Sequence, residues 1–98
     1  MLITANNVVG GGDSWVVDSN GIPVVHELTT GVNTVTFTLP NLNYAYCPYI
    51  NSADGTTPPN YTSCTNTGNV CTVVTTAVTT DQQGSGGHDC YLMMRIIK

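Results

Sequence analysis

The sequence predicts an all-β fold, a small antiparallel β-sandwich of about six to eight strands with a jelly-roll or an Ig-like topology. Three observations predict this class. Apolar residues alternate with threonines along short runs, which is the two-residue period of a half-buried strand. Clusters of glycine, asparagine and proline separate these runs at intervals of roughly 8–12 residues. Helical patterns are almost absent, and 98 residues are enough for one domain.

The N-terminal part of the sequence is predicted to be an arm followed by a hairpin. Residues 1–12 are small and polar and end in three glycines, which is typical of a flexible arm. The β-sandwich domain is then expected to span residues 13–98. Its first two strands are predicted at 14–18 and 22–28, because the Asn-Gly pair at 20–21 supplies the positive φ angles of a type I′ turn.

The next two strands are predicted from alternation and from tyrosine content. Residues 34–39 alternate apolar side chains with threonines, so this strand should have one buried and one wet face. Pro40 ends it, since proline cannot donate to the ladder. A tyrosine-rich strand is expected at 43–50. Six side chains on the 34–39 strand and on the last strand are predicted to share one core: Val35, Phe37, Leu39, Leu92, Met94 and Ile96.

Two long loops and one irregular strand are expected in the second half of the chain. Residues 51–69 and 80–88 are rich in turn-forming residues and are predicted to be loops. Residues 70–79 are predicted to form a strand. Its apolar alternation slips between Val73 and Val74, which indicates a β-bulge or burial on both faces.

The last strand, predicted at 89–97, is apolar on both faces. One face carries Cys90, Leu92, Met94 and Ile96, and the other carries Tyr91, Met93, Arg95 and Ile97. A sheet with one solvated face does not need a second apolar face. Either the strand is central in the sandwich, or a neighbouring subunit covers the face formed by Tyr91, Met93, Arg95 and Ile97.

The composition excludes two classes of partner. Only 8% of the residues are charged, against about 25% in an ordinary domain, and 16 threonines and 10 asparagines take their place. Lysine and arginine together number 2, too few for a nucleic-acid groove or a polybasic membrane patch. No run approaches the roughly 18 apolar residues of a membrane span, and the N-terminus lacks the pattern of a signal peptide.

The four cysteines allow three interpretations. A disulfide framework would pair Cys64 with Cys71 across a hairpin mouth and Cys47 with Cys90 between strands. Alternatively, all four are free thiols that pack as small apolar side chains. A metal site is the third interpretation. Because the sequence contains no CxxC pair, no metal site is predicted.

The sequence contains no recognisable catalytic motif, so no enzymatic activity and no cofactor are predicted. His26 is interpreted as a structural histidine. The candidate binding residues are Tyr46, Tyr49, Tyr61 and His88, because exposed tyrosine is a common binding anchor and His88 follows a glycine-rich loop. The alternative for the tyrosines is packing in the core or over a sheet edge.

From residue 15 onward the chain resembles a known class of module. The features that carry the resemblance are the Trp-Val-Val strand at 15–17, the Asn-Gly turn, the sequence Thr-Val-Thr-Phe-Thr-Leu-Pro at 34–40 with Asn-Tyr-Ala at 43–45, and the apolar strand at 90–97. They resemble small β-sandwich modules in virion structural proteins of tailed bacteriophages. The resemblance implies a non-enzymatic virion component, a capsid decoration, head-fibre or tail-fibre-tip protein.

Three classes of function therefore compete. A virion protein would be a homotrimer that docks on other virion proteins through residues 1–12, stabilises the particle and contacts a glycan or protein of the host surface. Its location would be the extracellular particle, which is released by lysis and needs no signal peptide. The alternatives are an extracellular adhesin or filament subunit of a cell surface, and a small disulfide-rich secreted effector or enzyme. The lack of a catalytic cluster argues against the last of these.

Overall fold

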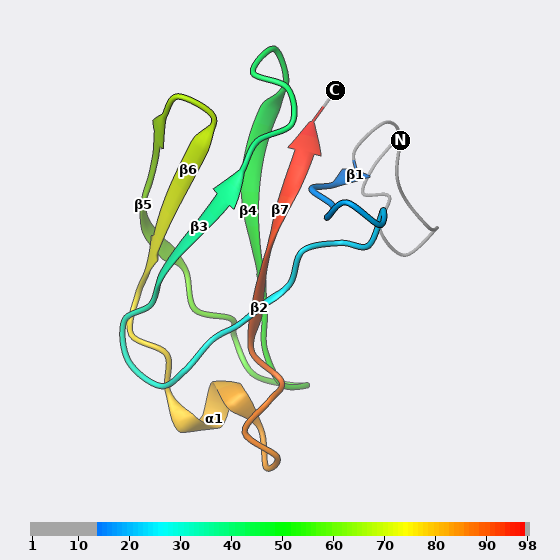
Figure 1. Cartoon of the computed structure of the whole chain (residues 1–98). Helices are drawn as coiled ribbons and strands as arrows, with labels where there is room; N and C mark the ends of the chain where they lie inside the picture. The colour runs from blue at the N-terminus through cyan, green and yellow to red at the C-terminus, as the bar shows by residue number, and fades with distance from the viewer. Residues whose placement is uncertain (1–13, 98) are drawn as a thin grey trace.

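Strands dominate residues 14–97, which are the residues that this computed structural model describes (Figure 1). The predicted arm at 1–12 lies outside them. Within the described part there are seven strands and one helical turn: β1 (Ser14–Trp15), β2 (His26–Glu27), β3 (Thr34–Thr38), β4 (Ala45–Asn51), β5 (Tyr61–Thr67), β6 (Val70–Thr75), α1 (Thr80–Gln83) and β7 (Tyr91–Ile97). They form two antiparallel sheets, so the predicted all-β sandwich is confirmed.

The first sheet is built around β7. On one side β7 pairs with β4 along seven residues, from Ala45 opposite Ile97 to Asn51 opposite Tyr91. On its other side the short strands β1 and β2 pair with the two ends of β7. Strand β7 is therefore the central strand of this sheet, which is one of the two predicted alternatives. The chain itself covers part of its second face, since Met93 on that face is 8% exposed.

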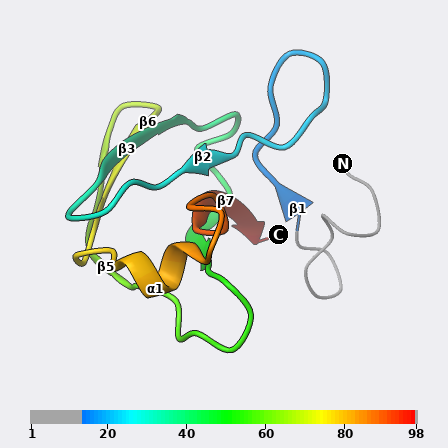
Figure 2. The same cartoon turned by 90° about the horizontal axis from the view of Figure 1, so that it is seen from below.

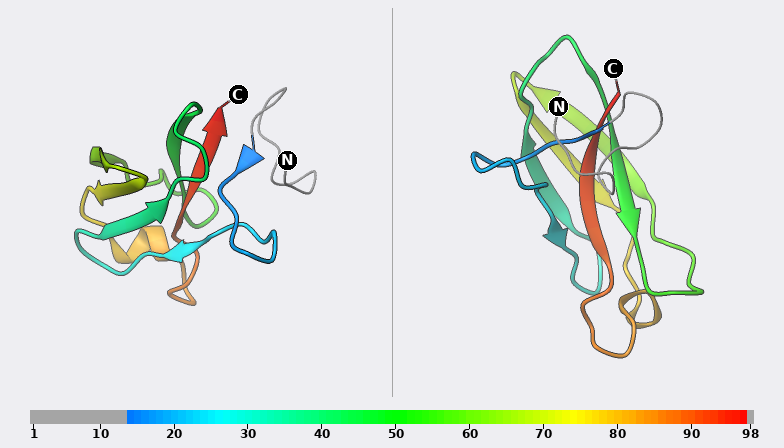
Figure 3. Two further views of the ribbon diagram at one scale, coloured as in Figure 1. Left: turned by 45° about the horizontal axis from the view of Figure 1, so that its top comes forward. Right: turned by 90° about the vertical axis from the view of Figure 1, so that its right-hand side faces the viewer.

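The second sheet has the order β3–β6–β5. Strand β3 runs antiparallel to β6, with Phe37 opposite Cys71. The ladder continues past β3 through a bond from the Leu39 amide to the Asn69 carbonyl, 2.6 Å long. Figure 3 shows the two sheets from two further directions.

The core lies between the sheets and contains the residues that alternation predicts. Phe37, Leu39, Leu92, Met94 and Ile96 are all buried in one cluster, and Val35 is partly buried against it. The cluster also takes in Val16, Leu28, Cys71, Val73, Val78 and Cys90. Apolar burial of this kind is the main stabilising contribution in a chain of this size.

The prediction of a loop at 51–69 is wrong for the second half of this range. Residues 61–67 form β5, the edge strand beside β6, and the true loop covers only residues 52–60. Tyrosine and threonine favour strands. The strand nevertheless lacks apolar alternation because nearly all of its residues are exposed at the sheet edge, so periodicity could not reveal it.

The expected loop at 80–88 contains the single helical turn α1. Thr79 caps it: the Thr79 hydroxyl accepts from the Gln82 amide at 3.3 Å, and the Gln82 side chain accepts from the Thr79 amide at 2.8 Å. This reciprocal capping box is visible in the sequence as Thr-x-x-Gln. Figure 1 shows α1 below the lower ends of the strands, and Figure 2 shows it beside the 52–60 loop. The Ala53 amide donates to the Gln82 carbonyl at 3.0 Å and ties the loop to α1.

The first hairpin is present, but its ladder is shorter than predicted. The Val24 amide donates to the Val16 carbonyl at 3.0 Å, and Val17 and Pro23 form an isolated bridge. The two-residue strands β1 and β2 pair with β7 and not with each other. The turn depends on Gly21, whose φ is 79°, and on the Asp18 carboxylate. That carboxylate accepts from the amides of Asn20 and Ile22 at 2.8 and 3.0 Å and thereby replaces ladder bonds with local ones.

The slip in the 70–79 strand has a different cause from either predicted one. Strand β6 keeps its register with β3, and Thr75 takes an inward position after Cys71 and Val73. The buried Thr75 hydroxyl accepts from the Asn33 amide at 3.0 Å, so Val74 remains on the outer face. The irregularity lies in the partner strand, where the register shifts between Tyr61 and Ser63.

Candidate functional site

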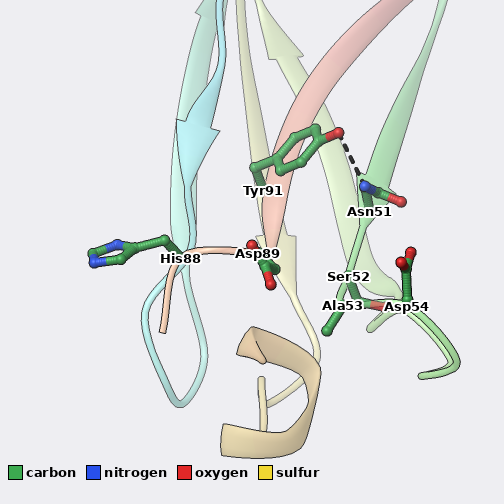
Figure 4. A pocket seen from close by; sticks show the side chains of 7 residues that line it. All are labelled: Asn51, Ser52, Ala53, Asp54, His88, Asp89 and Tyr91. Atoms are coloured by element: carbon green, nitrogen blue, oxygen red, sulfur yellow. Dashed lines mark hydrogen bonds between the residues drawn. The ribbon is translucent and has the colours of Figure 1, made fainter. Parts of the chain in front are cut away.

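A pocket of about 300 Å³ opens at the loop end of the sandwich (Figure 4). We call it the loop-end pocket, and it is lined by Asn51, Ser52, Ala53, Asp54, His88, Asp89 and Tyr91. These residues come from the end of β4, the start of the 52–60 loop, the residues that precede β7, and the first residue of β7. The site therefore joins two segments that are far apart in the sequence.

The antiparallel register of β4 and β7 brings these segments together. Asn51 lies directly opposite Tyr91, and its side-chain amide donates to the Tyr91 hydroxyl at 2.9 Å. Because that hydroxyl accepts from Asn51, its own proton is available to a ligand. The backbone of Asp89 is fixed by a hydrogen bond from its amide to the Gln83 carbonyl, 3.0 Å long.

Gly84 lies close to two residues of the loop-end pocket, Asp89 and Ala53. Its φ of 72° and ψ of 179° lie in a region that only glycine adopts readily. A Cβ atom at this position would stand 2.5 Å from Asp89 Oδ2 and 3.2 Å from the Cβ of Ala53. The glycine therefore lets the chain pass close beneath two pocket residues.

His88 borders the pocket but faces away from its other residues. Figure 4 shows its ring directed to the opposite side from Asp54. Its Nδ1 atom lies 2.6 Å from Glu27 Oε1, and both side chains are largely exposed. The hydrogen bond with Glu27, helped by the negative charges of Glu27 and Asp89, raises the pKa of His88 above its usual value. The predicted binding residue is thus part of a surface ion pair.

The loop-end pocket is suited to a ligand rich in hydroxyl groups. Asp54 and Asp89 offer carboxylate acceptors, Tyr91 offers a donor and a flat apolar ring, and Asn51 adds an amide. A few placed polar groups beside one aromatic ring are typical of small-ligand sites. Two carboxylates also disfavour an anionic ligand.

Two of the predicted binding tyrosines have structural roles instead. The Tyr46 hydroxyl donates to the Asn41 carbonyl at 2.6 Å and accepts from the Asn41 amide at 3.1 Å, and its ring packs against the core. The Tyr49 ring lies 5.2 Å from that of Trp15, and the Arg95 guanidinium stands 5.7 Å from its centroid. Both rings have partners within the chain, which favours the alternative interpretation of these two tyrosines, packing in the core or over a sheet edge.

The predicted interface residues lie along β7, but they do not form one exposed apolar patch. Met93 is only 8% exposed, because a single chain already covers it, and its cross-strand neighbour is Tyr49. Tyr91 and Arg95 are half-buried, and Ile97 is exposed. The patch expected to need a subunit cover is therefore smaller than predicted.

All four cysteines are free thiols. The predicted bond between Cys47 and Cys90 is wrong. Cys47 lies opposite Arg95, five residues beyond Cys90, which corresponds to roughly 16 Å along a strand; a disulfide needs Cα atoms within about 7 Å. Cys64 and Cys71 are brought together as predicted, with their Sγ atoms 3.2 Å apart, but they are not bonded.

Tyr61, the remaining predicted binding residue, is exposed on the edge strand β5. The pKa of its hydroxyl is raised above the usual value, first by the nearby Cys47 thiolate and then by partial desolvation and a hydrogen bond with Cys47. Its hydroxyl therefore meets a side chain of the other sheet. Tyr61 lies outside the loop-end pocket, so the structure does not bring the four predicted binding residues together.

Residue patterns did not point to Asn51, Asp54 and Asp89 as members of one site. They are scattered in the sequence, and only the register of β4 with β7 unites them. Their positions could have indicated the site. Polar residues at the end of one antiparallel strand and at the start of its partner meet at the same end of the sheet.

Within residues 14–97, no group of three or more histidine, cysteine, aspartate or glutamate side chains could hold a metal ion. In the same residues, no helix has the length and apolar character to cross a membrane.

No known protein-family model, curated protein or solved structure matches this chain.

Proposed function

We propose that this chain is a non-enzymatic structural and attachment module of a bacteriophage virion, acting as a capsid decoration, head-fibre or tail-fibre-tip protein. The sequence resemblance given above motivates the virion, and the fold is compatible with it. The observation that carries the attachment role is the loop-end pocket, in which Tyr91, Asn51, Asp54 and Asp89 converge.

The ligand class that suits this pocket is a neutral or amino sugar of a host-surface glycan. Sugar hydroxyls both donate and accept hydrogen bonds, so they can donate to the carboxylates of Asp54 and Asp89 and accept from the Tyr91 hydroxyl. The apolar face of a sugar ring can lie on the Tyr91 ring. An amino sugar would gain further from the two negative charges.

The surroundings of the pocket favour binding over catalysis. The Ser52 hydroxyl donates to the Thr56 carbonyl at 2.8 Å, so it is used to fold the loop. His88 is paired with Glu27 rather than with Ser52. A nucleophile needs a base within hydrogen-bond reach, and these two side chains have other partners.

Assembly belongs to the same proposal. The chain would form a homotrimer through the β7 surface that includes Arg95 and Ile97, away from the pocket residue Tyr91, and residues 1–12 would dock on other virion proteins. The exposed end of this surface, at Ile97, is 38% accessible in a single chain. Apolar surface of this kind favours association when it is continuous with a subunit contact.

The glycan role is tested by binding the full chain to an immobilised panel of neutral and amino-sugar oligosaccharides from bacterial surfaces. We expect selective binding that falls at least about tenfold in Asp89→Asn, which corresponds to one lost hydrogen bond. Asp81→Asn is the matched control, because Asp81 is exposed and lies outside the loop-end pocket. Equal binding by both variants, or no binding to the panel at all, would refute the attachment role.

A further inference from the structure

The β5–β6 hairpin holds two thiols in contact on one side of its sheet. Cys64 lies opposite Val73, and Asn66 lies opposite Cys71, so the two cysteines are diagonal neighbours on the same face. Their Sγ atoms are 3.2 Å apart. A disulfide is about 2.05 Å long, so a movement of little more than 1 Å would join them.

The two thiols differ in their access to solvent. Cys64 is exposed at the edge strand, whereas Cys71 is 1% exposed and belongs to the core. Burial, followed by the hydrogen bond and charge interaction with Cys64, raises the pKa of Cys71 to about 12. A dissolved reagent therefore meets Cys64 first, and Cys71 reacts only with a group already placed beside it.

We propose that Cys64 and Cys71 are a redox-active pair that a low-molecular-weight disulfide oxidises to an intramolecular disulfide. The Cys64 thiolate attacks the small disulfide, forms a mixed disulfide and releases one thiolate. The Cys71 sulfur then attacks Cys64 Sγ and releases the second. Two protein thiols and one small disulfide become one protein disulfide and two small thiols, and the two protons pass to the released thiolates.

The other two cysteines are placed outside this reaction. Cys90 is completely buried in the core, and burial raises its pKa. Cys47 is half-buried on β4, where its thiol lies near the Tyr61 hydroxyl and donates to the Pro48 carbonyl at 3.5 Å. Among the four cysteines, the fold therefore favours the pairing of Cys64 with Cys71. This inference does not depend on the proposed virion role.

The disulfide between Cys64 and Cys71 would stabilise the pairing of the edge strand β5 with β6. Among residues 14–97, β6 is the only strand that pairs with β5. A bond between residues 64 and 71 would link the two strands covalently near the hairpin turn. Exposed edge strands are sites of unwanted pairing with other chains. Oxidation would hold β5 in place where the protein meets an oxidising environment.

The test uses the full chain in mixtures of oxidised and reduced glutathione, followed by alkylation, intact mass measurement and non-reducing peptide mapping. We expect one species that has lost two hydrogen atoms and carries a 64–71 link. Cys47→Ala and Cys90→Ala should give the same link, and Cys64→Ala should give none. Cys71→Ala should stop at one glutathione on Cys64.

Two results would overturn the proposal. One is four free thiols in the wild-type chain after equilibration with oxidised glutathione alone, and the other is a link between any other pair. If Cys71→Ala does not fold, an alkylation time course of the wild type replaces it. Glutathione must then appear first on Cys64, and its first appearance on Cys47 or Cys90 would contradict the order of attack.

Discussion

The rings of His26 and Phe37 meet edge to face across the two sheets, with their centroids 5.0 Å apart and their planes at 88°. His26 comes from β2, beside β7, and Phe37 comes from β3. Phe37 is 3% exposed. This contact therefore links the inner faces of the sandwich, and it explains how a histidine is accommodated beside the core.

Replacing Phe37 with alanine should lower the free energy of unfolding by about 3–5 kcal/mol, because it removes a buried ring and leaves a cavity. Chemical denaturation measures this change. Thr36→Ala is the matched control on the same strand: Thr36 is exposed, so its change should stay within about 0.5 kcal/mol. A loss below about 1 kcal/mol for Phe37→Ala would show that the ring is not a core residue.

The strands that could be predicted are those whose side chains alternate between core and solvent. The run at 34–39 is the clearest example, and β3 covers most of it. Strand β5 could not be found in this way, because an edge strand exposed on both sides imposes no apolar period. Propensity alone indicates it, and propensity is a weak signal for strands.

The candidate site was less predictable than the fold. The sequence singled out His88 and Tyr91, and both line the loop-end pocket, but it assigned Tyr91 to a subunit interface. Asn51 and Asp89 are 38 positions apart in the sequence and meet only through the β4–β7 register. Pairing between distant strands is set by the whole core, so no local pattern encodes it.

Gly84→Ala should destabilise the protein by roughly 1–3 kcal/mol, because the backbone conformation at this position strongly disfavours any Cβ atom. The new methyl group would also collide with the Asp89 carboxylate. Gly86→Ala is the control, since a Cβ atom at Gly86 meets open space. The two variants are compared by urea denaturation, and equal stabilities would show that the chain accepts a Cβ atom at Gly84 without strain.

The ion pair between His88 and Glu27 should make a small, pH-dependent contribution to stability. The pKa of His88 is raised in the folded state, so the stabilisation is fully present below the unfolded value of about 6.5. It is lost as the pH rises through the folded pKa. Glu27→Gln should return the pKa of His88 toward its ordinary value, as measured by NMR titration of the imidazole. Glu27 is exposed, so this variant should keep its fold.

An unchanged pKa of His88 in Glu27→Gln would show that the pair does not persist in solution.

The proposed trimer can be tested by analytical ultracentrifugation of the full-length chain at micromolar concentration. We expect a species of three chains, and we expect Ile97→Asp to dissociate it, because a charge at an apolar contact must be desolvated without a partner. Val32→Asp is the matched control: Val32 is 65% exposed and lies before β3, outside the β7 surface. A stable wild-type monomer, with the same behaviour after removal of residues 1–12, would count against both the β7 interface and the docking arm. Dissociation by both variants alike would also contradict the β7 interface, since the effect would then not depend on where the charge is placed.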